Sequence, residues 1–414
     1  MELKSEHKHT VTKIVPTDWE VSTIGDVTKW VSGGTPNRGN AEYWEGSIPW
    51  ISGSTLKSLE ISTSDQFLTE QGVEAGSKMA PINATLLLVR GSALHSCIRA
   101  GLVVAPVSFN QDVKALIPDR SVNPKYLTIY LLAMENSLLK LVSSAGNSAG
   151  VLDTGLVKNF VFFKPPRHEQ DVIVEAISDM DALIQSLEQQ IIKKQQIKQG
   201  AMQTLLNPYE ENRKLKQGWV KRQLSSIANV IDPHPSHRAP PEAKHGIPFL
   251  GIGDFDEHGN IISKNPRIVS SLVHSEHSER YDLTKNLIGL GRVASIGKVI
   301  RLQSTLPFAI SPTLGVIEAV NVDSEFLYQA LRSNYVVSQF SKTMSGSTRS
   351  SVGMEVLRKL SIAMPEEGGA QKNIAQALVN MDADLLNLAS RLSKHQKLKQ
   401  GMMQNLLTGT VRLV

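Results

Sequence analysis

Residues 197–206 read IKQGAMQTLL, and residues 398–407 read LKQGMMQNLL. Seven of the ten positions are identical, and both copies carry a glycine inside a segment that otherwise favours a helix. In a helix interior such a glycine costs about 1 kcal/mol relative to alanine. A repeat of this kind predicts that one structural unit occurs twice in the chain, so the repeat decides the architecture.

The repeat continues through a longer segment with helical periodicity. From Gln170 and from Gln371 the two copies align without a gap for 38 residues, of which 16 are identical. Apolar residues follow one another at steps of 4-3-4-3-4, which is typical of a helix packed lengthwise on another helix. These positions are Ile173, Ile177, Met180, Ile184, Leu187 and Ile191 in the first copy, and Ile374, Leu378, Met381, Leu385, Leu388 and Leu392 in the second.

Each helix of about 40 residues would be about 60 Å long at 1.5 Å per residue. Two such helices in one chain can bury their apolar stripes against each other. Because a whole globular segment separates them in the sequence, we expect them to pair in antiparallel orientation. Two independent amphipathic helices, each packed on its own domain, are the alternative.

The segments before the helices are related at an offset near 200. Trp19 matches Trp219, and Pro165 matches Pro365. The string IPWI (48–51) matches IPFL (247–250), and NPKYL (123–127) matches DSEFL (323–327). Apolar runs such as ATLLLV predict short buried strands, and KYLTIYLLAMENSLLKLV predicts amphipathic helix.

The sequence therefore predicts an α+β fold with a pseudo-two-fold internal repeat. Two globular domains of mixed helix and sheet are separated by two long helices that form an antiparallel coiled coil. The predicted boundaries are 1–166 for the first domain, 167–207 for the first helix, 208–365 for the second domain and 366–414 for the second helix and tail.

Charge and cysteine content narrow the class of protein. The net charge is +5, and residues 207–365 alone carry 19 basic against 14 acidic side chains, while residues 1–166 carry 15 of each. A basic second half fits a polyanionic partner, and a solvated surface explains it equally well. Cys97 is the single cysteine, and no apolar leader or spanning run occurs, so we expect a cytoplasmic protein.

Motifs of catalysis and metal binding are missing from the sequence. The string GLGRVASIGKV (289–299) lacks the spacing and the final Ser or Thr of a phosphate-binding loop. No adenine-methyltransferase signature occurs. Six histidines fall within residues 234–277, but none has the spacing of a zinc site, and Cys97 beside His95 fits a buried thiol better than a nucleophile. We therefore expect neither a metal nor an active site.

The combined order of several strings resembles the specificity subunit of type I restriction–modification enzymes. The first domain opens with DWEVSTIGDVTKWVSGGTPNRGNAEYWEGSIPWIS and closes with SSAGNSAGVLDTGLVKNFVFFKPPRHEQ, and the chain ends in KQGMMQNLLTGTVRLV. These strings are similar to the opening of the family's target-recognition domain, to its lead into the spacer helix and to its tail. The second domain departs from the pattern, because GGTP and EYW are absent and PEEGGAQ replaces PPRHEQ.

The resemblance implies a non-catalytic subunit that binds a bipartite, asymmetric sequence in double-stranded DNA. It implies that partner subunits carry out adenine methylation and DNA cleavage: two methyltransferase subunits and two motor–nuclease subunits. It also implies that S-adenosylmethionine, ATP and Mg belong to those partners, with no cofactor on this chain. A coiled-coil scaffold whose two domains bind protein or glycan is the alternative.

Base reading requires polar side chains on loops that reach base edges. The loops of the two domains give these DNA-binding candidates: Arg38, Asn40, Lys57, Arg90, Ser92, Asn110, Gln111, Asn147, Arg292, Ser295, Lys298, Ser311, Thr313, Ser347 and Arg349.

Two copies of one partner need the same docking face twice, which the repeated decapeptide supplies. The partner-binding candidates are Gly200, Met202 and Leu205 with Gly401, Met403 and Leu406. A tight crossing of the two helices at the glycines is the alternative explanation of the repeat.

Overall fold

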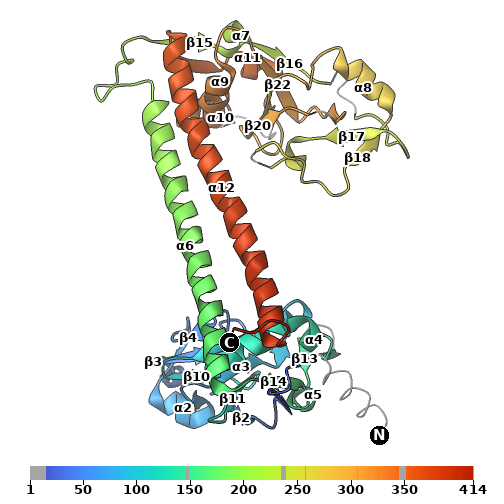
Figure 1. Ribbon diagram of the computed structural model, residues 1–414. Coiled ribbons are helices and arrows are strands. Elements are labelled where there is room, and N and C mark those ends of the chain that lie inside the picture. The colour runs from blue at the N-terminus through green and yellow to red at the C-terminus, as the bar shows by residue number, and fades with distance from the viewer. Residues whose placement is uncertain are drawn as a thin grey trace. The chain divides into compact units, whose positions relative to one another are not determined.

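A computed structural model describes residues 15–145, 149–234, 239–256, 258–304, 306–344 and 351–413 (Figure 1). The chain divides into two compact units, of which the first is made of two separate segments and the second is continuous in sequence. Unit 1 comprises residues 1–188 and 391–414, and unit 2 comprises residues 189–390. Each unit therefore holds one globular domain together with parts of both long helices. Within the described residues, no helix is long and apolar enough to cross a membrane.

The globular domain of unit 1 contains three sheets and an antiparallel strand pair. The five-stranded sheet has the order β2 (Thr28–Ser32), β11 (Val113–Pro118), β7 (Thr85–Leu88), β9 (Ala100–Val103) and β4 (Glu60–Ile61). The four-stranded sheet has the order β5 (Phe67–Leu68), β3 (Trp44–Ile51), β10 (Val107–Phe109) and β6 (Lys78–Ala80), and the three-stranded sheet has the order β12 (Val142–Ala145), β13 (Ala149–Leu152) and β8 (Arg90–Gly91). The separate pair consists of β1 (Glu20–Thr23) and β14 (Val161–Lys164). The helices are η1 (Ala41–Tyr43), α2 (Glu70–Gly76), η2 (Ser92–His95), α3 (Pro124–Ala133), α4 (Glu135–Leu139) and α5 (Thr154–Lys158).

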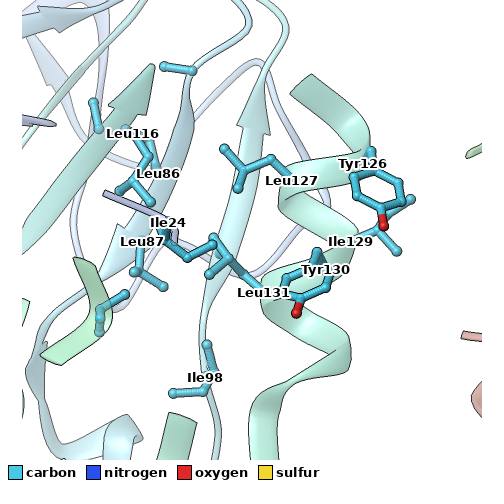
Figure 2. Packing of buried hydrophobic residues seen from close by; sticks show 14 of the residues in the cluster. Ile24, Leu86, Leu87, Ile98, Leu116, Tyr126, Leu127, Ile129, Tyr130 and Leu131 are labelled. Carbon is cyan, nitrogen blue, oxygen red and sulfur yellow. The ribbon is translucent and has the colours of Figure 1, made fainter. Parts of the chain in front are cut away.

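The core of this domain forms where α3 packs on the five-stranded sheet (Figure 2). The Asn123 side chain caps α3 by accepting from the backbone N–H groups of Lys125 and Tyr126, and Pro124 occupies the first turn. Apolar residues cover the helix so completely that every residue from Tyr126 to Leu131 is buried. The helix predicted from the KYLTIYLL string is thus a core element.

Unit 2 contains a related domain with fewer strands in each sheet. The four-stranded sheet has the order β16 (Ala228–Ile231), β22 (Leu314–Ala319), β19 (Leu287–Gly291) and β20 (Val299–Leu302). The three-stranded sheet has the order β18 (Arg267–Val269), β17 (Ile247–Leu250) and β21 (Ala309–Ile310), and β15 (Trp219–Gln223) pairs with β23 (Ser361–Pro365). The helices are α7 (Leu224–Ile227), η3 (Ile252–Asp254), α8 (Ser271–Ser278), α9 (Ser324–Leu331), α10 (Asn334–Met344) and α11 (Met354–Arg358).

Strand register confirms the alignment of the two domains. The parallel pair β3–β10 aligns Ile51 with Phe109, and the parallel pair β17–β21 aligns Leu250 with Ile310. IPWI and IPFL therefore occupy the same strand in both domains. The NPKYL and DSEFL strings likewise both begin a buried helix, capped in the second domain by Asp323.

The two long helices are α6 (Arg167–Leu205) and α12 (Gly368–Leu407). All twelve apolar stripe positions are buried or partly buried, whereas most residues between them are exposed. In each unit the helices lie side by side in opposite directions (Figure 1). The ion pair of Asp181 with Lys399 joins them in unit 1, and Lys194 with Asp384 and Lys198 with Asp382 join them in unit 2. The antiparallel pairing expected from the sequence is present in each unit.

The C-terminal ends of both helices pack on globular cores, which changes the interpretation of the repeated decapeptide. Leu406 is buried in the core of the unit 1 domain, with Met403 packed against it. Met202 and Leu205 pack against the core of the unit 2 domain. These four apolar side chains help to hold each helix end on a domain of its own unit, although Met202, Leu205 and Met403 stay partly exposed. Their role in binding a partner remains a prediction.

The two glycines behave differently from the four apolar residues. A Cβ atom added at Gly200 or at Gly401 would meet no atom of the described residues within 4 Å. No helix crossing occupies these positions, so the tight-crossing explanation is wrong. The open space beside both glycines leaves them available to a partner outside the chain.

Candidate nucleic-acid interface

A cleft of about 820 Å³ opens in the domain of unit 1, beside the ends of β3 and β10. It is lined by the loop after each strand, by β8 and by the start of η2. Six of the DNA-binding candidates lie on its wall: Arg38, Lys57, Arg90, Ser92, Asn110 and Gln111. The fold thus brings together residues that are up to 73 positions apart in the sequence, since 111 minus 38 is 73.

Arg38 is held at the cleft by two tryptophans. Its guanidinium carbon lies 5.1 Å from the ring centroid of Trp44 and 5.3 Å from that of Trp50. The two rings pack edge to face with centroids 5.2 Å apart. Stacking on aromatic faces orders the guanidinium before any ligand arrives, which lowers the entropy cost of a directed contact.

The charged groups on the cleft wall are mostly basic. Arg38, Lys57, Arg90 and Arg99 line it, against the single carboxylate of Asp112. Arg99 also donates from Nη1 to the carbonyl of Gly53 at 2.6 Å, which fixes its position. A concave basic wall of this kind attracts a polyanion such as the DNA backbone.

Asn110 lies at the floor of the cleft, directly after β10. Its backbone N–H donates to the carbonyl of Ile51 at 2.9 Å, and the residue is only 6% exposed. The amide Nδ2 donates to Oδ2 of Asp112 at 3.3 Å. Gln111 beside it accepts at Oε1 from the hydroxyl of Thr35 at 2.6 Å.

One further candidate of this domain does not line the cleft, and another cannot be placed. The side chain of Asn40 accepts from the backbone N–H of Glu42 at 3.1 Å and caps η1, away from the cleft wall. Asn147 lies outside the described residues. Asn40 is therefore a structural cap in this fold.

In unit 2 the position of Asn110 is occupied by Ser311. Ser311 follows β21 as Asn110 follows β10, and its N–H donates to the carbonyl of Leu250 at 2.8 Å. Its hydroxyl lies 2.7 Å from the hydroxyl of Thr313, which stands at the position of Asp112. Ser311 is 7% exposed, nearly the same as Asn110. The two domains therefore present different polar groups on the same backbone frame.

Two basic candidates of unit 2 are engaged inside the domain. The ammonium of Lys298 donates to the carbonyls of Phe255 at 2.6 Å and Ile252 at 3.3 Å. Arg292 donates from Nε to the carbonyl of Val352 at 3.1 Å, and Asp232 lies 3.6 Å from its Nη1. Both side chains are structural in this geometry. Ser295 is exposed on the intervening loop, and Ser347 and Arg349 lie outside the described residues.

Several residues of the cleft wall were missed by the sequence prediction. They are Thr35, Ser52, Ser54, Ser96, Arg99 and Asp112. Each is a single polar residue on a short loop or strand end, and periodicity gives no signal for such positions. Asp112 could have been found, because it follows Asn110 and Gln111 in the same loop.

The histidine-rich stretch of unit 2 forms a buried ring pair. The rings of His234 and His277 pack edge to face with centroids 5.0 Å apart, and Tyr281 lies against His277. Burial, with the nearby His234 as a second cause, lowers the pKa of His277 from 6.5 to about 4. No cluster of three or more metal-ligating side chains occurs in the described part of the chain.

The geometry defines a class of protein in which two related recognition domains share one frame, differ in the groups they present, and join to paired antiparallel helices. The family model for the type I restriction modification DNA specificity domain matches residues 16–199 and again residues 216–395. The chain belongs to this family.

Curated relatives and solved structures agree with this assignment. The chain is 31% identical to the specificity subunit of the type I restriction enzyme EcoR124I/EcoR124II from Escherichia coli, over 44% of this chain and 45% of that protein. It is 22% identical to the MjaIX specificity subunit from Methanocaldococcus jannaschii, over 99% and 97% of the two chains.

The fold is shared with a type I restriction-modification S subunit from M. genitalium, with a TM-score of 0.57 at 15% identity over 95% of this chain and 96% of that one. A chain from a structural study of complex assembly and conformational transition of the type I R-M system gives a TM-score of 0.63 at 15% identity, over 96% and 99%.

Proposed function

We propose that this chain is the DNA-recognition subunit of a type I restriction–modification complex and reads a bipartite, asymmetric DNA sequence. The observation that carries the proposal is the pair of equivalent positions Asn110 and Ser311. Both lie on the same backbone frame, and they present an amide in one domain and a hydroxyl in the other. Different groups on one frame favour two different DNA words, whereas a palindrome requires two alike domains.

The chemistry belongs to partner subunits in this proposal. The chain directs adenine methylation and DNA cleavage by two methyltransferase and two motor–nuclease subunits. S-adenosylmethionine, ATP and Mg bind to those partners. The missing methyltransferase and phosphate-loop motifs support a non-catalytic role for this chain.

The test is methylation-site sequencing of genomic DNA from cells that express the chain with its partner methyltransferase. We expect modified adenines in one split motif with a spacer of free sequence. Modification in a continuous motif, or DNA binding that is independent of sequence, would contradict the proposal. A scaffold for protein or glycan would leave the methylation pattern unchanged when the chain is removed.

The same proposal gives a revised docking face for the two methyltransferase copies. On α6 an exposed stripe comprises Ile197, Gly200 and Thr204, and on α12 the corresponding stripe comprises Leu398, the partly exposed Gly401 and Asn405. The spacing i, i+3, i+7 places each set on one helix face. Ile197 is 52% exposed and Leu398 is 49% exposed, so both copies present a large apolar side chain at the equivalent position.

Alanine substitutions at Gly200 and Gly401 should change the stability of the free chain and the binding of the methyltransferase in opposite directions. Because an added Cβ meets nothing, Gly200→Ala and Gly401→Ala should each stabilise the free chain by about 1 kcal/mol. If the partner backbone approaches there, the same variants should weaken methyltransferase binding, and Gly200→Arg with Gly401→Arg should abolish it. Mass photometry that still counts two partners on the double arginine variant would exclude this face. Lys193→Arg, an exposed change on α6, is the control.

A further inference from the structure

The buried amide of Asn110 has an acceptor atom without a partner. Among the described residues, its Oδ1 has no hydrogen-bond partner, although the residue is only 6% exposed and lies on the cleft wall. An unsatisfied buried polar atom costs free energy, so proteins rarely leave one without a role. Oδ1 itself has less than 1 Å² of accessible surface in the free chain, so a hydrogen-bond donor can reach it only when the adjoining cleft wall moves aside on binding.

Asp112 fixes the orientation of this amide. An amide can rotate by half a turn and exchange its oxygen with its nitrogen. At Asn110 the rotated form would place Oδ1 against Oδ2 of Asp112, where two acceptors repel each other. The observed form donates from Nδ2 to that carboxylate at 3.3 Å. The free acceptor is thus imposed by the neighbouring charge.

Duplex DNA offers few donors to such an acceptor. Phosphate and deoxyribose oxygens only accept hydrogen bonds. In the major groove the base donors are the N6 amino group of adenine and the N4 amino group of cytosine, and in the minor groove the N2 amino group of guanine. A buried acceptor in a DNA-binding cleft therefore pairs with a base and discriminates among bases.

We infer that Asn110, oriented by Asp112, is a specificity-determining residue that accepts a hydrogen bond from the exocyclic amino group of adenine or cytosine in the major groove. The inference rests on the proposed DNA-recognition function and concerns one position in the word read by the first domain. Asn110 contacts the base directly, whereas Asp112 is a positioning residue that acts through the amide.

The second domain carries no such requirement at the equivalent position. Ser311 and Thr313 present hydroxyl groups, which both donate and accept. The word read by the second domain is thus free of this selection for an amino group, and it serves as an internal control in every experiment below.

The experiment uses the assembled complex of this chain with its methyltransferase subunits and the DNA duplex found by methylation-site sequencing. Base analogues remove single amino groups: purine replaces each adenine of the first word, and 2-pyrimidinone replaces each cytosine. We expect one replacement to weaken binding by about 5- to 150-fold, the range of one base contact. The analogue that does so identifies the base as adenine or cytosine.

Asn110→Leu removes the acceptor while keeping the number and branching of the side-chain heavy atoms. This variant should lose discrimination at that one position and bind the natural and the analogue duplex equally, while discrimination in the second word stays unchanged. Asp112→Ala removes the acceptor that orients the amide. The amide of Asn110 can then rotate, so the variant should also accept bases with a carbonyl acceptor, guanine or thymine, at the same position.

The outcomes separate this inference from the proposed function. Undiminished discrimination in Asn110→Leu, or dependence on the guanine N2 group in inosine-substituted duplexes, overturns the inference while the complex still recognises a bipartite sequence. Absence of any sequence-dependent binding by the wild-type complex overturns the proposed function itself. If Asn110→Leu fails to fold, the same analogues are measured with Asp112→Ala, and an unchanged base preference in that variant overturns the inference.

Discussion

The side chains of Gln170 and Gln371 make the same two hydrogen bonds, one set in each unit. In unit 1, Nε2 donates to the carbonyl of Pro165 at 2.9 Å, and Oε1 accepts from the N–H of Asn123 at 2.8 Å. In unit 2 the corresponding partners are Pro365 at 2.8 Å and Asp323 at 3.0 Å. Both amides are buried, so each ties the last strand and the start of the long helix to the cap of the core helix.

Replacing Gln371 by leucine should destabilise unit 2 strongly. The change leaves a carbonyl and an N–H without partners in a buried place, and each such group costs about 1–3 kcal/mol. Denaturant unfolding should show a loss of about 2–6 kcal/mol in the free energy of unfolding. Gln376→Leu, on the exposed face of the same helix, is the control and should change stability little. Equal stability of the two variants would show that the amide is dispensable.

A carboxylate in the middle of the apolar stripe tests the pairing of the helices. Leu388 is 6% exposed and Leu386 on the same helix is 48% exposed. Leu388→Asp should destabilise the chain by several kcal/mol, because it buries a charge without a partner. Leu386→Asp should be nearly neutral. Thermal unfolding of the two variants side by side decides the matter, and similar losses would argue against a buried stripe.

Arg412, in the C-terminal tail, forms a charged cluster with Asp18 and Glu169 in unit 1. It makes paired hydrogen bonds to Asp18 at 2.9 and 2.8 Å, and it donates at 2.7 Å to Glu169, which is buried. The guanidinium lowers the pKa of Asp18 below its usual 3.8. This carboxyl group therefore stabilises the fold above pH 3.8, and the contribution is lost as the pH falls through the lowered pKa.

Arg412→Gln should therefore reduce stability at pH 7, because it also leaves the buried carboxylate of Glu169 without its cation. The difference from wild type should shrink below about pH 4, where carboxyl groups become protonated. Melting temperatures recorded from about pH 7 to about pH 3 give the comparison, with Lys397→Gln on the exposed helix face as control. A difference that is constant across this range would mean that the ion pairs contribute nothing.

The buried His277 should make unit 2 sensitive to acid. Its pKa is about 4 in the fold and 6.5 ordinarily, so unfolding takes up a proton between these values. Stability should be complete above pH 6.5 and should decline as the pH falls toward 4. His277→Leu should flatten this decline, whereas His245→Leu, at an exposed site, should leave it as in the wild type. Melting temperature against pH measures both.

Sequence periodicity predicted most of the architecture. The roles of the site residues depend instead on contacts made in the folded chain, which periodicity does not reveal. The stripe from Ile173 to Ile191 is visible as a 4-3-4 spacing because helix packing demands it. The sequence does not reveal which groups the side chains of Arg292 and Lys298 contact, since basic residues on a glycine-bounded loop can contact DNA or carbonyl groups inside the domain equally well. The role of Asp112 depends on the amide beside it and has no signature of its own.

If each domain reads its own DNA word, exchanging one domain should change one word only. Because the cleft of unit 1 is built from residues 35–112 alone, replacing residues 16–166 with the corresponding domain of another family member should change one DNA word only. Gln170 lies outside the replaced segment, so the graft must keep its two partners: a capping residue at the position of Asn123 and a backbone carbonyl at that of Pro165. Methylation-site sequencing with the partner methyltransferase should then show a new first word beside the original second word. The reciprocal graft of residues 216–365 is the control and should change the other word. If both words changed together after either graft, the two domains would not read DNA independently, and the internal repeat would not explain a bipartite target.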